Sequence, residues 1–171
     1  MKTKGIVMLV VVTTLLLSGI PYGCSTSSGI IQPIVGYIPE GWYCGENPYG
    51  TLEIEGRRVG FIECVDTLVG ENAVMIVYGD VFQELKGNES DLDALIARAT
   101  RYQSEPYESG IMTVAGQLAG WSKVYHSDNE WYNMRIVFVK GSTCVEISAV
   151  YRTNSEDEVM SLIASIYLPA Q

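Results

Sequence analysis

The N-terminal segment constrains this chain most, because it decides in which compartment the rest of the chain folds. Lys2 and Lys4 precede an uncharged apolar run over residues 6–17, which Gly19 and Pro21 then interrupt. A membrane-spanning helix needs about 20 apolar residues, and this run is shorter. A basic start, an apolar middle and a break are typical of an export signal. We therefore predict that residues 1–23 are a signal segment and that the remainder works outside the cytoplasm.

The residues that follow indicate an anchor. Gly23 and Cys24 resemble the end of a bacterial or archaeal lipoprotein signal, in which the cysteine is lipidated and becomes the mature N-terminus. The resemblance implies a lipid anchor at Cys24 on the outer face of the cell membrane, followed by a polar tether over residues 24–33. Simple secretion and an uncleaved anchor are the alternatives.

Charge narrows the choice of partners. Without Lys2 and Lys4 the chain carries 9 basic and 20 acidic residues, a net charge of −11. A surface of this sign repels nucleic acid and anionic lipid headgroups, so we expect no nucleic-acid partner and a membrane association that depends on the lipid. The acidic residues are dispersed, which favours a role in solubility over a metal site. Residues 34–171 are long enough for one domain with its own core.

Four cysteines, at positions 24, 44, 64 and 144, are informative in an exported chain because disulfides persist outside the cytoplasm. A tight turn at Glu55-Gly56 would place Glu53 opposite Arg58 and bring Cys44 close to Cys64, with a bulge near Asn47 and Pro48 absorbing the remaining offset. We therefore predict that Cys44 and Cys64 form a disulfide and that Cys144 remains a thiol. The spacings match no zinc pattern, and zinc binding by leftover thiolates with His126 is the weaker alternative.

The periodicity predicts strands and two amphipathic helices. Residues 73–78 form a continuous apolar run between glycines, which suits a strand covered on both faces. The first helix is expected after a cap at Ser90, with its apolar stripe ending before Pro106, and the second after a cap at Ser155, ending before Pro169. Each helix has one apolar face, so both are expected to cover a sheet.

Between the helices we predict a three-stranded meander with turns at Asp128-Asn129 and Lys140-Gly141. The first turn pairs Tyr125 with Tyr132 and Trp121 with Ile136, which puts Lys123 on the core face unless it snorkels at an edge or a bulge near Gly120 shifts the register. The second turn pairs partners that alternate between a core face and an opposite face. These pairs are Phe138 with Thr143, Ile136 with Val145, Met134 with Ile147, Arg135 with Glu146 and Val137 with Cys144.

The order of these elements, with the phrases Ile38-Pro39-Glu40-Gly41-Trp42 and Ala119-Gly120-Trp121, resembles the PsbP-like family over roughly residues 34–168. The resemblance implies an α+β fold, an α/β/α sandwich with a central antiparallel sheet and two amphipathic helices. The family includes an extrinsic photosystem II subunit and exported bacterial and archaeal relatives. It implies binding or assembly help at a membrane-associated complex and transfers no chemistry.

The familiar catalytic constellations do not occur in the sequence. It contains no Gly-x-Ser-x-Gly and no phosphate-binding Gly-x-x-x-x-Gly-Lys loop, and its single histidine, His126, is expected beside a turn at a strand end. We therefore expect no catalytic residues, no metal and no cofactor. Asn88-Glu89-Ser90 is a glycosylation sequon, although Ser90 is also the expected helix cap.

Two hypotheses follow. The first is a lipid-anchored, non-enzymatic accessory or binding module that meets a partner at the membrane surface. The second is an extracytoplasmic metal-dependent or thiol-using enzyme, which would require the acidic groups, Cys144 and His126 to converge in one cleft.

Overall fold

The computed structural model describes residues 30–46, 52–54, 56–67, 70–82, 85, 90–103 and 107–170. The signal segment, Cys24, Asn88 and the bulge expected near Asn47 and Pro48 lie outside these residues. The elements, in chain order, are β1 (Ile34–Val35), β2 (Trp42–Glu46), β3 (Leu52–Ile54), β4 (Arg57–Asp66), β5 (Ala73–Gly79), α1 (Leu92–Thr100), β6 (Glu108–Val114), β7 (Gln117–His126), β8 (Trp131–Lys140), β9 (Thr143–Arg152), a 3-10 turn (Thr153–Ser155), α2 (Glu156–Ala164) and β10 (Ile166–Tyr167).

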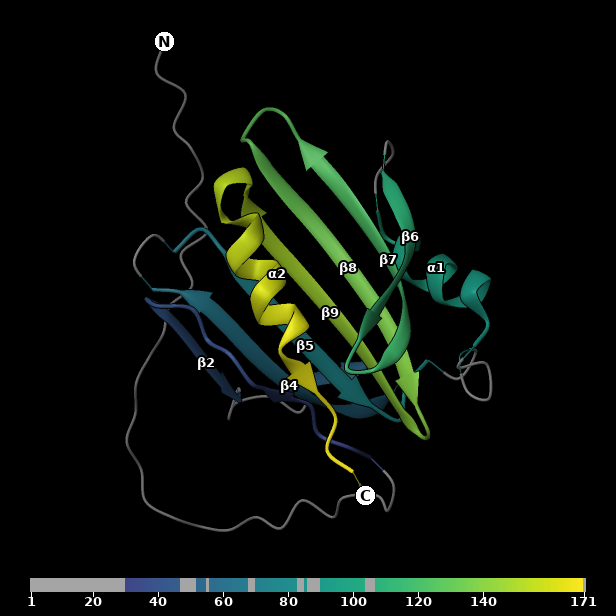
Figure 1. The fold of residues 1–171 in the computed structure, drawn as a ribbon. Helices are drawn as coiled ribbons and strands as arrows, with labels where there is room; N and C mark the ends of the chain where they lie inside the picture. The colour runs from purple at the N-terminus through teal and green to yellow at the C-terminus, as the bar shows by residue number, and fades with distance from the viewer. Residues whose placement is uncertain are drawn as a thin grey trace, which may run out of the picture.

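A large antiparallel sheet forms the centre of the molecule (Figure 1). Within the described ranges its strand order is β2-β4-β5-β9-β8-β7-β6, and β3 pairs with the start of β4 outside that path. The small β1–β10 pair stands apart from it. β9 therefore lies in the middle of the sheet, which agrees with its five consecutive buried residues from Thr143 to Ile147.

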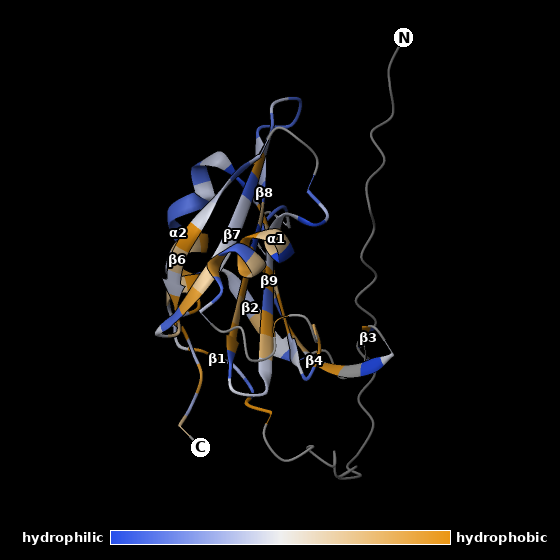
Figure 2. Ribbon diagram, turned by 90° about the vertical axis from the view of Figure 1, so that its right-hand side faces the viewer, coloured by the Kyte–Doolittle hydropathy of each residue, from blue (hydrophilic) through white to orange (hydrophobic). Residues whose placement is uncertain are grey.

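The two helices cover opposite faces of this sheet (Figures 1 and 2). On one face α2 buries Val159, Leu162 and Ile163 against a core that includes Ile136 and Ile147. On the other face α1 buries Leu95 and Ala99 against Val137 and Val139. This three-layer arrangement confirms the predicted α+β class, because each helix packs its apolar residues against one face of the sheet. No helix in the described part of the chain is long and apolar enough to cross a membrane.

The predicted pairing of β7 with β8 is correct. Tyr125 pairs with Tyr132 and Trp121 with Ile136, and the register continues through Gly120 without a bulge. Lys123 therefore does lie on the α2 face, where its Nζ is 3.0 Å from Oε1 of Glu156 and 4.5 Å from the centre of the Tyr132 ring.

The predicted pairing of β8 with β9 is wrong by two residues. Lys140 pairs with Thr143 and Ile136 with Ile147, so the two turn residues are Gly141 and Ser142, not Lys140 and Gly141. Gly141 has φ +58°, the conformation that a two-residue hairpin turn needs at its first central position. A shift of two preserves the faces, because side chains alternate with period two.

Local hydrogen bonds show how the helices are capped and where the folded part of the chain starts. The cap of α1 is Asp91, whose Oδ1 accepts from the N–H of Ala94, and not Ser90. Ser155 occupies the capping position of α2 as predicted but makes no side-chain cap bond, and its Oγ accepts from Nδ2 of Asn72. Ile31, expected in the tether, is buried, and its N–H donates to Oγ1 of Thr143 at 2.7 Å. The folded part of the chain therefore includes Ile31.

Candidate functional site

The residues singled out from the sequence do not meet in one place. A disulfide joins Cys44 to Cys64, which are direct partners across β2 and β4. His126 stacks on Trp131 at 4.8 Å between ring centres, beside the β7–β8 turn. Cys144 is a buried thiol near the start of β9. The other end of β9, at Arg152, pairs with Trp131 and so lies beside His126. His126 and Cys144 therefore lie near opposite ends of the sheet.

A concave polar feature lies where several elements end or begin. It is a pocket of about 280 Å³ at the end of β4, the start of β5, the end of β9 and the first turn of α2. Its lining is mainly polar, with one indole: Glu40, Trp42, Asp66, Glu71, Asn72, Arg152, Asn154, Ser155 and Glu158. Ligand pockets in proteins begin near this volume.

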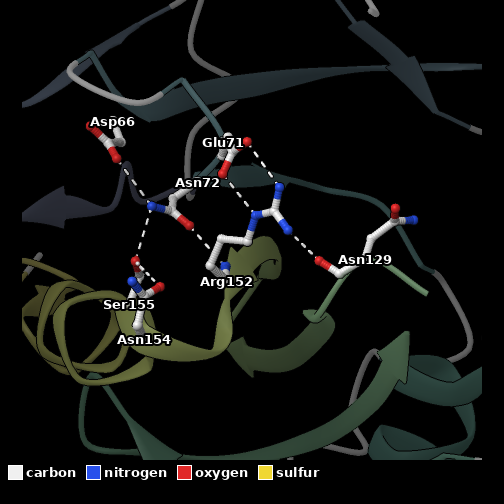
Figure 3. Close-up of polar contacts among 7 residues, drawn as sticks. All are labelled: Asp66, Glu71, Asn72, Asn129, Arg152, Asn154 and Ser155. Atoms are coloured by element: carbon white, nitrogen blue, oxygen red, sulfur yellow. Dashed lines mark hydrogen bonds and ion pairs between the residues drawn. The ribbon is translucent and has the colours of Figure 1, made fainter. Parts of the chain in front are cut away.

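Asn72 holds the pocket together (Figure 3). Its Nδ2 donates to Oδ2 of Asp66 and to Oγ of Ser155, both at 3.1 Å, and its Oδ1 accepts from the N–H of Arg152 at 2.9 Å. Its carbonyl accepts from the N–H of Asp66 at 3.0 Å. Asn72 is buried, so these bonds form away from water and fix β4, β5, β9 and the start of α2 relative to one another.

Arg152 closes one side of the pocket through its guanidinium. Nε and Nη2 donate to the two carboxylate oxygens of Glu71, at 2.7 and 2.9 Å, and Nη1 donates to the carbonyl of Asn129 (Figure 3). The hydrogen bond from Arg152 lowers the pKa of Glu71, and the same bond raises the pKa of Arg152. Both side chains are exposed, so the pair sets geometry more than stability.

The lining favours ligands that donate hydrogen bonds. The lining contains four carboxylates and one guanidinium, that of Arg152, so its formal net charge is −3. The carboxylates are Glu40, Asp66, Glu71 and Glu158. Amide and hydroxyl groups of Asn154 and Ser155 add to its rim, and the indole of Trp42, which is 9% exposed, forms part of its wall. Among the residues described, no three His, Cys, Asp or Glu side chains gather as a metal-ligand group. The arrangement suits ammonium, hydroxyl or amide groups.

A second polar cluster is enclosed between α1 and the sheet. Glu146 accepts from Arg135 and, at 3.4 Å, from Arg98, and all three side chains are buried or nearly so. Arg98 also lies over the ring of Phe82 at 3.6 Å, and Tyr102 lies over Arg135 at 5.0 Å. The predicted Arg135–Glu146 neighbourhood therefore exists, although Arg135 pairs across the strands with Ser148 and Glu146 with Val137. We regard this cluster as part of the α1 core because packing covers it.

The sequence did not point to the Asn72 pocket. Its members are separated by up to 118 residues. The patterns that contain Glu40, Trp42 and Ser155 indicated the fold and a helix cap, and none of them indicated a binding site. One signal was available: Asp66 and Asn72 flank the turn between two apolar strands, and Arg152, Asn154 and Ser155 follow a third. Their convergence depends on β5 pairing with β9, a non-local contact that the alternation of residues does not specify.

Comparisons with known proteins bear on the fold. No protein-family model and no curated protein matches this sequence. LpqN of Mycobacterium tuberculosis, a protein involved in cell envelope biogenesis, is 10% identical, with a TM-score of 0.51 over 82% of this chain and 86% of LpqN. A Bacteroides thetaiotaomicron protein is 14% identical with a TM-score of 0.49 over 78% of this chain, which spans 44% of that protein. The PsbP protein of the cyanobacterium Synechocystis is 12% identical with a TM-score of 0.43, over 87% of this chain and 99% of the other. The chain therefore has the same kind of fold as LpqN.

Proposed function

We propose that the protein is an exported, lipid-anchored, non-enzymatic binding module on the outer face of the cytoplasmic membrane. On this proposal residues 1–23 are removed, Cys24 carries the lipid, and the domain holds a partner, such as a membrane protein complex, through the Asn72 pocket. The signal-like N-terminus supports export, and the Cys44–Cys64 disulfide fits an oxidising compartment. The fold shared with LpqN, a protein involved in cell envelope biogenesis, is consistent with such a place.

The pocket is the observation that carries the binding role. Asn72 and Asp66 are buried and hydrogen-bonded, so the floor of the pocket is held in one arrangement before any ligand arrives. Preorganisation of this kind lowers the entropy lost on binding. The rim is acidic and exposed at Glu71 and Glu158, so it can accept hydrogen bonds from a partner and attract positive charge. We therefore expect the bound group to be a donor-rich segment of a partner, such as one bearing lysine or an amine.

A pair of matched substitutions tests this role. Glu158 and Asp157 are neighbouring exposed carboxylates in the first turn of α2, but only Glu158 lines the pocket. Glu158→Arg places a long cation over the pocket, whereas Asp157→Arg makes the same change of charge outside it. The full chain, tagged at its C-terminus, is cross-linked in intact cells and purified, and the co-purified material is quantified.

We expect Glu158→Arg to lower the recovered partner by about tenfold or more, because a like charge now opposes the donor that binds there. Asp157→Arg should recover the wild-type amount. Equal recovery with both variants would show that the pocket is not the binding site. Thermal unfolding of both variants checks that neither loss comes from misfolding.

A further inference from the structure

The β1–β10 pair and the residues beside it carry no charged side chain. Residues 30–39 and 165–170 contain no Asp, Glu, Lys or Arg, and we call them together the β1–β10 strip. They lie side by side because β1 pairs with β10 and the N–H of Gly36 donates to the carbonyl of Ser165. An uncharged strip in a domain of strongly negative charge is a surface that solubility does not explain.

The strip exposes large apolar side chains. Ile34, Tyr37, Ile38 and Tyr167 are 40–49% exposed. Ile34 and Tyr167 are direct partners across the antiparallel pair, so their side chains are neighbours. The ring of Tyr167 also lies against Gly36, 3.7 Å from where a Cβ of that residue would stand. These contacts bring Ile34 and Tyr167 together on one exposed apolar surface, and Tyr37 and Ile38 follow Gly36 directly along the chain. Exposed apolar surfaces of this kind mark interaction sites.

The β1–β10 strip starts only a few residues after Cys24 along the chain. The N–H of Ile31 donates to Oγ1 of Thr143, just after the β8–β9 turn, and Nζ of Lys140 lies 3.4 Å from the carbonyl of Leu168. In Figure 1 this end of the sheet lies at the bottom, beside the C-terminus. Six residue steps separate Cys24 from Ile30, which span at most about 20 Å when extended and about 13 Å on average as a flexible chain. A lipid at Cys24 therefore keeps the strip close to the bilayer.

We propose that the β1–β10 strip rests on the lipid surface and so orients the domain on the membrane. This inference depends on the lipid anchor of the proposed function and adds a second, weaker contact. Tyrosine and isoleucine suit the boundary between headgroups and acyl chains, where one end of the tyrosine ring stays wet. The tether supplies an effective concentration in the millimolar range, so a contact too weak to bind a free protein is populated once the anchor is in place.

The contact also decides where the pocket points. Thr143 and Arg152 stand at the two ends of β9, about 30 Å apart along a ten-residue strand. Arg152 lines the pocket, and Thr143 holds Ile31 at the start of the strip. A domain that rests on the strip therefore holds its pocket roughly the length of β9 away from the lipid contact, open to a partner that projects from the membrane.

Two tyrosines provide a matched test. Tyr167 lies in the strip, and Tyr125 lies beside the β7–β8 turn at the Arg152 end of the sheet; they are 47% and 49% exposed. Each is replaced by cysteine in the lipidated full chain and given a nitroxide label, which Cys144 does not take up because it is buried. The proteins are reconstituted in phosphatidylcholine vesicles and in native membranes, and accessibility to a water-soluble nickel chelate and to oxygen is measured by electron paramagnetic resonance. The same labels on Cys24→Ser protein give the baseline.

We expect the label at position 167 to be several-fold less accessible to nickel and more accessible to oxygen than the label at 125, in both membranes, with no difference on Cys24→Ser protein. Equal nickel accessibility in protein that floats with the vesicles would overturn the lipid contact and leave the anchor intact. Failure to float would overturn the anchor and the inference with it. Protection at 167 in native membranes alone would assign the strip to a protein partner and refute the lipid contact.

Discussion

Gly120 of β7 lies directly beneath the backbone of Leu95 in α1: a Cβ atom on Gly120 would stand 2.3 Å from the carbonyl carbon of Leu95. Neither the strand nor the helix backbone can yield to such a contact by a rotamer change. The absence of a side chain at position 120 therefore sets the distance at which α1 packs on the sheet.

We expect Gly120→Ala to destabilise the protein by about 1–3 kcal/mol or more through overpacking, as measured by urea unfolding. Gly110→Ala in β6 is the control, because the atoms nearest to a Cβ there belong to the side chain of Trp121, the first at 3.1 Å, and a side chain can move where a backbone cannot. The account of the α1 layer fails if Gly120→Ala is as mild as Gly110→Ala.

The buried carboxylate of Glu146 compensates Arg98 and Arg135 under α1. Glu146→Gln keeps the shape of the side chain but leaves two guanidinium groups without their shared counter-charge. We expect a loss of about 3–5 kcal/mol in the free energy of unfolding. Glu71→Gln makes the same chemical change at an exposed ion pair with Arg152 and should cost much less. Similar losses from the two variants would show that Glu146 is not buried as described.

Tyr151 provides a test by pH. Burial first, and then the negative charge of Glu156, raise the pKa of this phenol above its ordinary value of 10.0. A raised pKa means that the neutral phenol contributes stability that is fully present below pH 10 and is lost as the pH rises above it. We expect the wild-type protein to lose more stability than Tyr151→Phe between about pH 8 and pH 11. Tyr167→Phe, at an exposed tyrosine, is the control. Equal losses in wild type and Tyr151→Phe would contradict the burial of this hydroxyl.

Local patterns predicted most of the fold. Alternation placed Ile136 and Ile147 on the core face, and the turn at Asp128-Asn129 gave the register of β7 and β8 without error. The error at the β8–β9 turn arose because Gly141 fits either central position of a two-residue turn, and only the pairing of Lys140 with Thr143 in the structure decides between them.

Non-local features could not be predicted in the same way. Arg98 lies on the buried side of α1, where an apolar residue would be expected. It can be buried there because it forms an ion pair with Glu146 of β9. The role of Asn72 likewise depends on residues 6, 80 and 83 positions away. Polar side chains bury themselves only when a partner is in place, so their positions follow from the assembled fold and not from periodicity.

Fractionation of Cys24→Ser tests the central claim most directly, since both the membrane location of the domain and the orientation of its pocket rest on a lipid at that residue. The substitution removes the thiol that would carry the lipid and leaves the described domain unchanged. We predict that the wild-type chain, with its signal removed, stays with the membrane fraction and that the variant appears in the soluble fraction, because a domain with a net charge of −11 is repelled by anionic headgroups. A Cys24→Ser protein that remains membrane-bound after proven cleavage of the signal would contradict the account.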